Sequence, residues 1–255
     1  MKSATARALS GLLAILSLGV TPAWAQAADD APGRCFVLHG HAALRACEEV
    51  IASSRPAEVR AEAHYNRGVE FNDFGRHTEA LAEFAEAVRL KPDYAAAYTN
   101  MGVALKKLSR WDDAVRAYRQ AARQNPQYPD ACYNLGVALA HLQRWDEALD
   151  ALHEAAQLNP RDADAFYNLG LVLNTLRRHG EALEAYRSAV QVQPAYVSAW
   201  GNLGLTAYLL GRYRESAEAF ETAQTLAPDY FDTRPVQRET WDAAQHQGPP
   251  AVRHR

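Results

Sequence analysis

Two cysteines and two histidines lie close together in the first fifth of the chain. Cys35 and Cys47 flank a segment that also contains His39 and His41. Thiolate and imidazole groups at short spacing can bind zinc or copper, whereas two nearby cysteines in an oxidising compartment usually form a disulfide. The choice between these two chemistries therefore depends on the compartment in which the protein resides.

The N-terminal segment 1–25 has the pattern of a secretory signal peptide. Lys2 and Arg7 form a basic region, residues 9–20 are apolar, and an Ala-Trp-Ala cleavage site ends at Ala25. The apolar stretch is about a dozen residues long, whereas a membrane-spanning helix needs about 20. We therefore expect cleavage after Ala25, no membrane insertion of the mature chain, and a periplasmic location, with secretion as the alternative.

In an oxidising compartment we expect a disulfide between Cys35 and Cys47, with a metal site that includes the two histidines as the alternative. Residues 26–60 are predicted to form an extended N-terminal strap and a lone helix, which the disulfide would join. The third cysteine, Cys132, is most simply a small buried apolar side chain.

The sequence contains little that resembles catalytic machinery. The nearest candidate is His153-Glu154, which has Gln157 where the helix of a zinc protease has its second histidine. There is no Gly-x-Ser-x-Gly elbow, phosphate-binding loop, dinucleotide fingerprint or haem attachment sequence. We therefore predict that the protein is not an enzyme and has no cofactor and no metal.

A second set of polar side chains recurs along the chain at one constant spacing. Its members are Asn66, Asn100, Asn134, Asn168 and Asn202. A primary amide has two donors and one acceptor, so it can bond both the C=O and the N–H of an extended peptide. Tyr65, Tyr133 and Tyr167 precede three of these asparagines, while Thr99 and Gly201 interrupt the column. The two columns are our candidate partner-binding residues.

Other columns with the same period indicate the elements that carry these side chains. Glycines recur two residues after each asparagine, at positions 68, 102, 136, 170 and 204. They are followed by small residues (Ala80, Ala114, Ala148, Ala182, Ser216), large apolar ones (Phe84, Tyr118, Leu152, Tyr186, Phe220) and prolines (Pro92, Pro126, Pro160, Pro194, Pro228). Helix-type spacing that ends at proline, repeated with this period, predicts stacked helix pairs. We expect the glycines to lie against the small residues where the two helices of a pair cross.

This pattern resembles the tetratricopeptide repeat (TPR) family over five consecutive ranges, 61–94, 95–128, 129–162, 163–196 and 197–230. The resemblance implies an all-α, right-handed superhelical solenoid of antiparallel helix pairs. It would begin with an N-terminal partial repeat and end, in residues 231–255, with a short capping helix and a frayed tail. His64 and Arg67 depart from the family pattern, which suggests that the first repeat is less ideal than the middle ones.

In the resembling family the first helices line a concave groove, so the asparagines are expected to face a bound peptide there. The alternative is that they cap or bridge neighbouring helices, and that the tyrosines pack on the next repeat. A further column, Arg76, Arg110, Arg144, Arg178 and Arg212, lies in the turn inside each repeat. These arginines either bind an acidic partner or bond the carbonyls that end the first helices.

The formal net charge is −3, with acidic and basic residues interspersed, so nothing indicates nucleic acid as a partner. We predict a non-catalytic periplasmic scaffold that binds a protein or an extended peptide in its groove, in assembly, secretion or envelope maintenance. The alternative is an accessory or redox- or metal-linked subunit of an envelope enzyme complex that uses the Cys35–Cys47 region.

Overall fold

The computed structural model describes residues 31–232 and 234–246, which contain 13 α-helices and no strand. The predicted signal peptide and the predicted frayed tail from residue 247 onward lie outside the described residues. The chain divides into two compact units between Arg110 and Trp111, inside the second predicted repeat.

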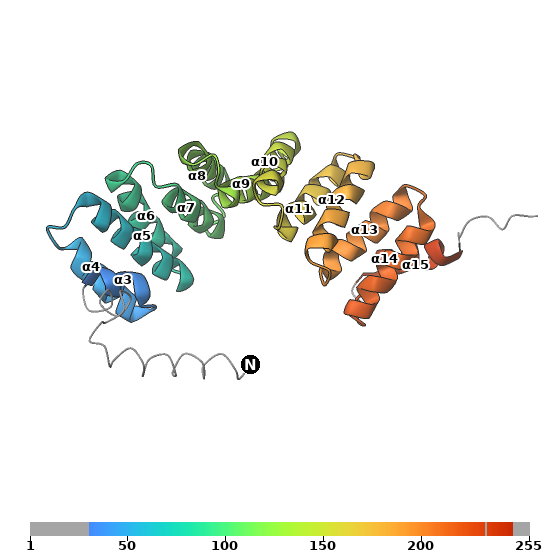
Figure 1. Cartoon of the computed structure of the whole chain (residues 1–255), viewed down its shortest axis with the longest axis horizontal. Coiled ribbons are helices and arrows are strands. Elements are labelled where there is room, and N and C mark those ends of the chain that lie inside the picture. The colour runs from blue at the N-terminus through green and yellow to red at the C-terminus, as the bar shows by residue number, and fades with distance from the viewer. Residues whose placement is uncertain (1–30, 233, 247–255) are drawn as a thin grey trace, which may run out of the picture. The chain divides into compact units, whose positions relative to one another are not determined.

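The described residues of the first unit, 31–110, contain five helices: α3 (Ala31–Val37), α4 (His41–Ile51), α5 (Ala57–Asp73), α6 (His77–Leu90) and α7 (Ala95–Lys107). Helix α3 packs on α4 and α5 packs on α6, while α4 also contacts α5 and α6 contacts α7 (Figure 1). Helices α4, α5 and α6 therefore each bury one side against the helix before it and another against the helix after it.

The second unit contains α8 (Trp111–Gln124), α9 (Pro129–His141), α10 (Trp145–Leu158), α11 (Ala163–Thr175), α12 (His179–Val192), α13 (Val197–Leu209), α14 (Tyr213–Leu226) and α15 (Pro235–His246). Pairs α9–α10, α11–α12 and α13–α14 follow the same packing scheme (Figure 1). The prediction of an all-α fold of antiparallel helix pairs is confirmed, whereas the five repeat ranges stay a prediction.

The prolines lie two residues beyond the last residue of each second helix, for example Pro160 after α10 and Pro194 after α12. Proline disfavours helix at the residue before it, so it separates each pair from the next. This position explains why one proline recurs in every repeat.

The recurring glycines permit close contact with the large apolar column, which was not the contact that we predicted. A Cβ added at Gly136 would lie 2.5 Å from Leu152, and one added at Gly170 would lie 2.5 Å from Tyr186. The nearest atoms therefore belong to the large residue of the opposite helix, and not to the small residue one turn before it. The buried large side chain fills the space that the missing side chain leaves.

In every repeat the turn after the first helix contains one residue whose backbone has the left-handed conformation. The φ angles are 73° at Gly75, 59° at Ser109, 58° at Gln143, 61° at Arg177 and 72° at Gly211. Only glycine adopts this conformation without steric cost, yet three of the five positions carry a side chain.

Arg177→Gly is therefore expected to raise the free energy of unfolding by about 1 kcal/mol, because relief of the left-handed strain exceeds the added chain entropy of the unfolded state. The midpoint of urea unfolding measures this change. Gly211→Ala is the matched control and is expected to shift the midpoint in the opposite direction. Equal signs for the two substitutions would contradict this interpretation of the turn.

The N-terminal segment differs from the predicted extended strap, because residues 31–37 form helix α3. Pro32 lies in the first turn, where proline is compatible with helix, and packing on α4 buries Cys35. The lone helix that we expected is therefore one member of a pair.

At the other end, α15 packs on α13 and α14, and the Trp241 ring stacks on Phe231 at 4.9 Å between centroids. This helix covers apolar surface at the end of the last pair. Among the described helices, none combines the length and apolar composition that crossing a membrane requires.

Candidate functional site

Asparagines and tyrosines of the two candidate columns bond one another between consecutive repeats. In three of the five asparagines, Nδ2 donates to the hydroxyl of a tyrosine in the first helix of the preceding repeat. The three bonds are Asn100 to Tyr65 at 3.1 Å, Asn168 to Tyr133 at 3.3 Å, and Asn202 to Tyr167 at 3.1 Å. We call these three bridges the Asn–Tyr ladder; the first lies in the first unit and the other two lie in the second.

A second hydrogen bond orients the amide. Nδ2 donates to the backbone carbonyl one helical turn earlier, from Asn100 to Ala96 at 3.1 Å and from Asn168 to Asp164 at 2.8 Å. Because a carbonyl only accepts, this bond identifies the amide nitrogen. The Oδ1 atoms of these asparagines then have no hydrogen-bond partner within residues 31–232 and 234–246. All five asparagines of the column are partly exposed.

The tyrosine hydroxyls of the ladder are protonated and accept from the asparagines. Burial raises the pKa of Tyr65, Tyr133 and Tyr167 above the ordinary tyrosine value. Each hydroxyl proton is therefore present at neutral pH and can be donated to another group. A bridge thus presents one acceptor, the asparagine Oδ1, and one donor, the tyrosine hydroxyl.

This pair of groups is complementary to a peptide bond, which also has one donor and one acceptor. Such contacts do not depend on the side chains of the bound segment. Asn100, Asn168 and Asn202 therefore bridge neighbouring helices, as one of our interpretations expects, whereas a peptide-facing role of the column stays a prediction.

The repeats without a tyrosine show why the ladder is interrupted. Thr99 replaces a tyrosine, and its hydroxyl bonds the carbonyl of Ala95 at 3.1 Å. Asn134, one repeat further on, donates to Asp130 O at 2.8 Å. Asn66 lies in α5, and the position that precedes it at the ladder spacing is Ala31, so it has no tyrosine there.

At the last repeat Gly201 replaces the tyrosine, and the ring of Tyr230 lies against it. A Cβ added at Gly201 would lie 1.5 Å from the Tyr230 hydroxyl oxygen. Tyr230 is itself buried. Tyr230, in the segment before α15, thus lies at the end of the tyrosine column, beside the position where Gly201 lacks a side chain.

Sequence reasoning missed a second tyrosine column that packs on the first. The ring of Tyr94 lies 5.0 Å from Tyr65, and that of Tyr196 lies 5.0 Å from Tyr167. Tyr196 also donates its hydroxyl proton to Asp164 at 2.5 Å. The signal was present, because Tyr94, Tyr128, Tyr196 and Tyr230 share one phase of the repeat period. These rings pack on Tyr65 and Tyr167 of the ladder, whereas the residue at the same phase of the repeat after Tyr133 is Asp162.

The predicted disulfide is present between Cys35 and Cys47, with 4.6 Å between their Cα atoms. Both residues are buried in a cluster with Ala46, Val50 and Ala63. The bond connects α3 to α4 and faces α5.

The two histidines of that segment have other contacts. His39 Nδ1 lies 3.3 Å from Glu70 Oε1, and the ring of His41 stacks on Phe74 at 5.1 Å. Glu70 also accepts from the backbone N–H of Gly40 at 2.6 Å. In the described part of the chain, no group of three or more histidine, cysteine, aspartate or glutamate residues could hold a metal.

The third cysteine is placed as the sequence predicts. Cys132 is buried in α9, in a cluster with Ala155, Ala156 and Ala165. Burial is the main cause that raises the pKa of the Cys132 thiol to about 11, and the nearby carboxylate of Glu154 adds to it. The thiol is therefore protonated at neutral pH and packs as a small apolar side chain.

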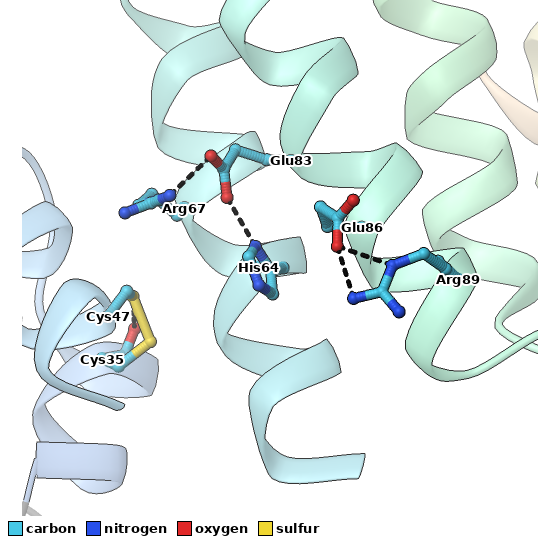
Figure 2. Close-up of polar contacts among 7 residues, drawn as sticks. All are labelled: Cys35, Cys47, His64, Arg67, Glu83, Glu86 and Arg89. Atoms are coloured by element: carbon cyan, nitrogen blue, oxygen red, sulfur yellow. Dashed lines mark hydrogen bonds and ion pairs between the residues drawn. A yellow bond between two sulfur atoms is a disulfide. The ribbon is translucent and has the colours of Figure 1, made fainter. Parts of the chain in front are cut away.

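The two departures from the family pattern in the first repeat contact the same carboxylate. His64 Nδ1 lies 2.8 Å from Glu83 Oε2, and Arg67 donates to Glu83 Oε1 at 2.6 Å (Figure 2). Burial alone would raise the pKa of Glu83, but the bonds to His64 and Arg67 hold it below the ordinary value. These polar residues therefore replace apolar packing between α5 and α6 with a buried ionic group.

Four of the five arginines of this column pair with a glutamate at the start of the second helix. Arg76 and Arg212 pair with Glu79 and Glu215, Arg144 bonds Glu147 at 2.7 Å, and Arg178 bonds Glu181 at 2.7 Å. The carbonyl that ends the first helix accepts instead from the arginine backbone N–H, as Leu173 O does from Arg178 at 2.9 Å. The arginines of the column therefore bond carbonyls near the end of the first helices, but through the backbone N–H, and an acidic partner for the guanidinium groups stays a prediction.

Comparison with known proteins identifies the family. A family model described as "Tetratricopeptide repeat" matches residues 99–157, 142–195 and 175–231, and a second, described as "TPR repeat", matches residues 70–109. The first model alone matches more than half of the chain, so the chain belongs to the tetratricopeptide repeat family. Proteins of this family are typically non-catalytic scaffolds that bind peptides or proteins.

Several solved structures share the fold. YrrB, described as a TPR protein with an unusual peptide-binding site, has a TM-score of 0.66 and 22% identity over 76% of this chain and 99% of its own. MamA from Desulfovibrio magneticus RS-1 has a TM-score of 0.61 and 25% identity over 66% of this chain and 96% of its own. Comparison with curated proteins gives no match.

Proposed function

We propose that this protein is a non-catalytic periplasmic scaffold that binds an extended segment of another protein along the Asn–Tyr ladder. The pathway would be assembly, secretion or maintenance of the cell envelope. The signal-peptide pattern of residues 1–25 supports export. The description of YrrB as a peptide-binding TPR protein supports the class of ligand.

The observation that carries the proposal is the pair of unused groups at each bridge. Within the described residues, Asn168 and Asn202 keep a free Oδ1, and the hydroxyls of Tyr133 and Tyr167 keep a proton to donate. Two consecutive bridges lie in the second unit, so one extended segment can contact both of them. Such a segment would form backbone hydrogen bonds to these groups. Because the asparagine and tyrosine side chains already bond each other, binding would cost little conformational entropy in the protein.

The alternative function, an accessory redox or metal-linked subunit, has less support. Cys35 and Cys47 are buried and bonded to each other. No contact of His39 or His41 in the described structure favours a metal over their present partners.

Affinity capture from envelope extract tests the proposal. The baits are the chain from residue 26 onward, the double variant Asn168→Ala/Asn202→Ala, and the control Gln124→Ala, which removes an exposed amide from α8. A segment of the captured protein is then titrated by fluorescence anisotropy. Loss of two hydrogen bonds of about 1 kcal/mol each predicts binding about 30-fold weaker for the double variant and unchanged for the control.

The alanine substitutions also remove the bridges between helices, so a second double variant removes the same bridges without truncating the asparagines. Tyr133→Phe/Tyr167→Phe keeps both rings and both asparagine Oδ1 atoms but removes the bridging hydroxyls and their protons. We expect circular dichroism to show the parent helix content and the anisotropy titration to show weaker binding. Parent-like affinity in both double variants would contradict the proposal.

A further inference from the structure

Two surface pockets in the second unit occupy equivalent positions in successive repeats. The first has a volume of about 520 Å³ and lies between α10 and α12, with Phe166, Leu169 and Leu173 of α11 among its lining residues. The second has a volume of about 480 Å³ and lies between α12 and α14, with Trp200 and Leu203 of α13 among its lining residues. Both are apolar at the first helix and bordered by charged side chains of the second helices.

In the second unit, successive second helices meet along three equivalent seams, α8/α10, α10/α12 and α12/α14. An arginine of one helix pairs with a glutamate of the next at two of these seams. Arg187 of α12 donates from Nε to Glu215 of α14 at 3.0 Å. Arg119 of α8 pairs with Glu147 of α10 at the equivalent seam before it. At the seam between α10 and α12 the residues at the same phase of the repeat are His153 and Glu181. This seam therefore lacks its arginine.

The glutamates at these seams each have room for two guanidinium groups. Glu147 bonds both Arg144 and Arg119, and Glu215 pairs with both Arg212 and Arg187. Glu181, by contrast, bonds only Arg178 of its own repeat within the described residues. A carboxylate has about four acceptor positions, so Glu181 retains capacity for a second arginine. Its side chain is 60% exposed, whereas that of Glu215 is 24% exposed.

The rim of the pocket between α10 and α12 is also open. Gly180 lies in the first turn of α12, and a Cβ added there would meet no atom within 4 Å. The equivalent residue in the next repeat is Arg214, which pairs with Glu218 at 2.9 Å. Glycine within a helix costs about 0.5 to 1 kcal/mol relative to alanine, and no close contact among the described residues requires it at position 180.

We propose that the pocket between α10 and α12 binds an arginine side chain of a partner protein. Its guanidinium would bond Glu181 at the position that Arg119 and Arg187 occupy at the neighbouring seams. The alkyl stem would pack on the apolar lining, and the planar guanidinium would stack on Phe166. This site uses residues other than those of the Asn–Tyr ladder, so either proposal can fail without the other.

Titration of the isotopically labelled protein with N-acetyl-arginine methylamide, followed by NMR, tests this site. We expect millimolar binding with amide shifts concentrated at His153, Gly180 and Glu181. The citrulline analogue, which has the same shape but no charge, and the lysine analogue are expected to bind at least tenfold more weakly. Equal shifts from all three probes, or shifts spread over the surface, would overturn the proposal.

Two variants assign the binding to this pocket. His153→Arg places in the seam the residue found at its equivalents, so it is expected to fold normally and to bind the arginine probe at least tenfold more weakly. Glu218→Gln alters the neighbouring pocket and is expected to leave binding unchanged. Parent-like binding by His153→Arg would show that the probe does not use this seam. If the same shifts arise from increasing protein concentration alone, the occupant is a second copy of the chain and the proposal is wrong.

Discussion

Glu83→Gln is expected to lower the free energy of opening of α5 and α6 by about 2 to 3 kcal/mol at pH 7. The side chain of Glu83 is 11% exposed and those of its partners His64 and Arg67 are 12% and 20% exposed. Neutralising the carboxylate leaves a mostly buried guanidinium without its counter-charge, which is the costly way to break a buried ionic group. Hydrogen exchange of the α5 and α6 amides measures the change.

The effect of this substitution has a defined pH dependence. The pKa of Glu83 is lower in the folded protein than in the unfolded chain, where it is about 4.3. The carboxylate therefore stabilises the fold above about pH 4.3, and this contribution is lost as the pH falls through the lower folded value. The difference between parent and variant should accordingly be full at pH 7 and should shrink as the pH falls below about 4.

Glu86→Gln is the matched control for Glu83→Gln. Glu86 lies one turn further along α6 and pairs with Arg89 at 2.8 Å, but the two side chains are 45% and 65% exposed (Figure 2). An exposed pair of this kind contributes roughly 0 to 1 kcal/mol. Equal effects of the two substitutions would show that Glu83 acts as one more surface charge.

Replacing both bonded cysteines, as Cys35→Ser/Cys47→Ser, is expected to destabilise the α3–α4 pair by about 3 kcal/mol. The disulfide closes a loop with a sequence separation of 12 residues, and chain entropy predicts a value of this size for such a loop. Amides of α4 should exchange faster in the variant, while amides of α11 to α14 should keep the parent rates.

Reducing agent provides the control, because the parent under reduction should reach the exchange rates of the double variant. Thiol counting in denaturant gives a separate test. The disulfide predicts one reactive thiol per chain, from Cys132, in the absence of reductant. Three reactive thiols in protein purified from the exported fraction would contradict the pairing.

The fold was predictable from the sequence because each column has its own physical cause. Helix-type spacing with a proline after each second helix defined the helix pairs, and the structure has them. The nearest neighbour of the recurring glycines differs from the predicted one, because spacing alone does not show which residue of the opposite helix lies nearest. The atoms nearest to a Cβ added at Gly170 belong to the ring of Tyr186 and not to the alanine one turn before it.

The site was predictable only in part. The asparagine and tyrosine columns were found from their period, but their pairing between repeats depends on how successive first helices stack. Periodicity within one repeat contains no information on that distance. The strap became helix α3 for a similar reason, because only its packing on α4 distinguishes a short helix from an extended segment.

The Asn–Tyr ladder explains the function if it recognises peptide backbone. The most direct measurement compares the captured partner segment with copies N-methylated at single backbone nitrogens, by anisotropy titration against the parent protein. N-methylation removes the donor that Asn168 Oδ1 or Asn202 Oδ1 would accept, while the side chains of the segment stay unchanged. We predict that one or two of these copies bind at least tenfold more weakly, and that alanine substitutions along the segment have smaller effects. Full affinity of every N-methylated copy, together with strong dependence on side chains, would contradict backbone recognition by the ladder.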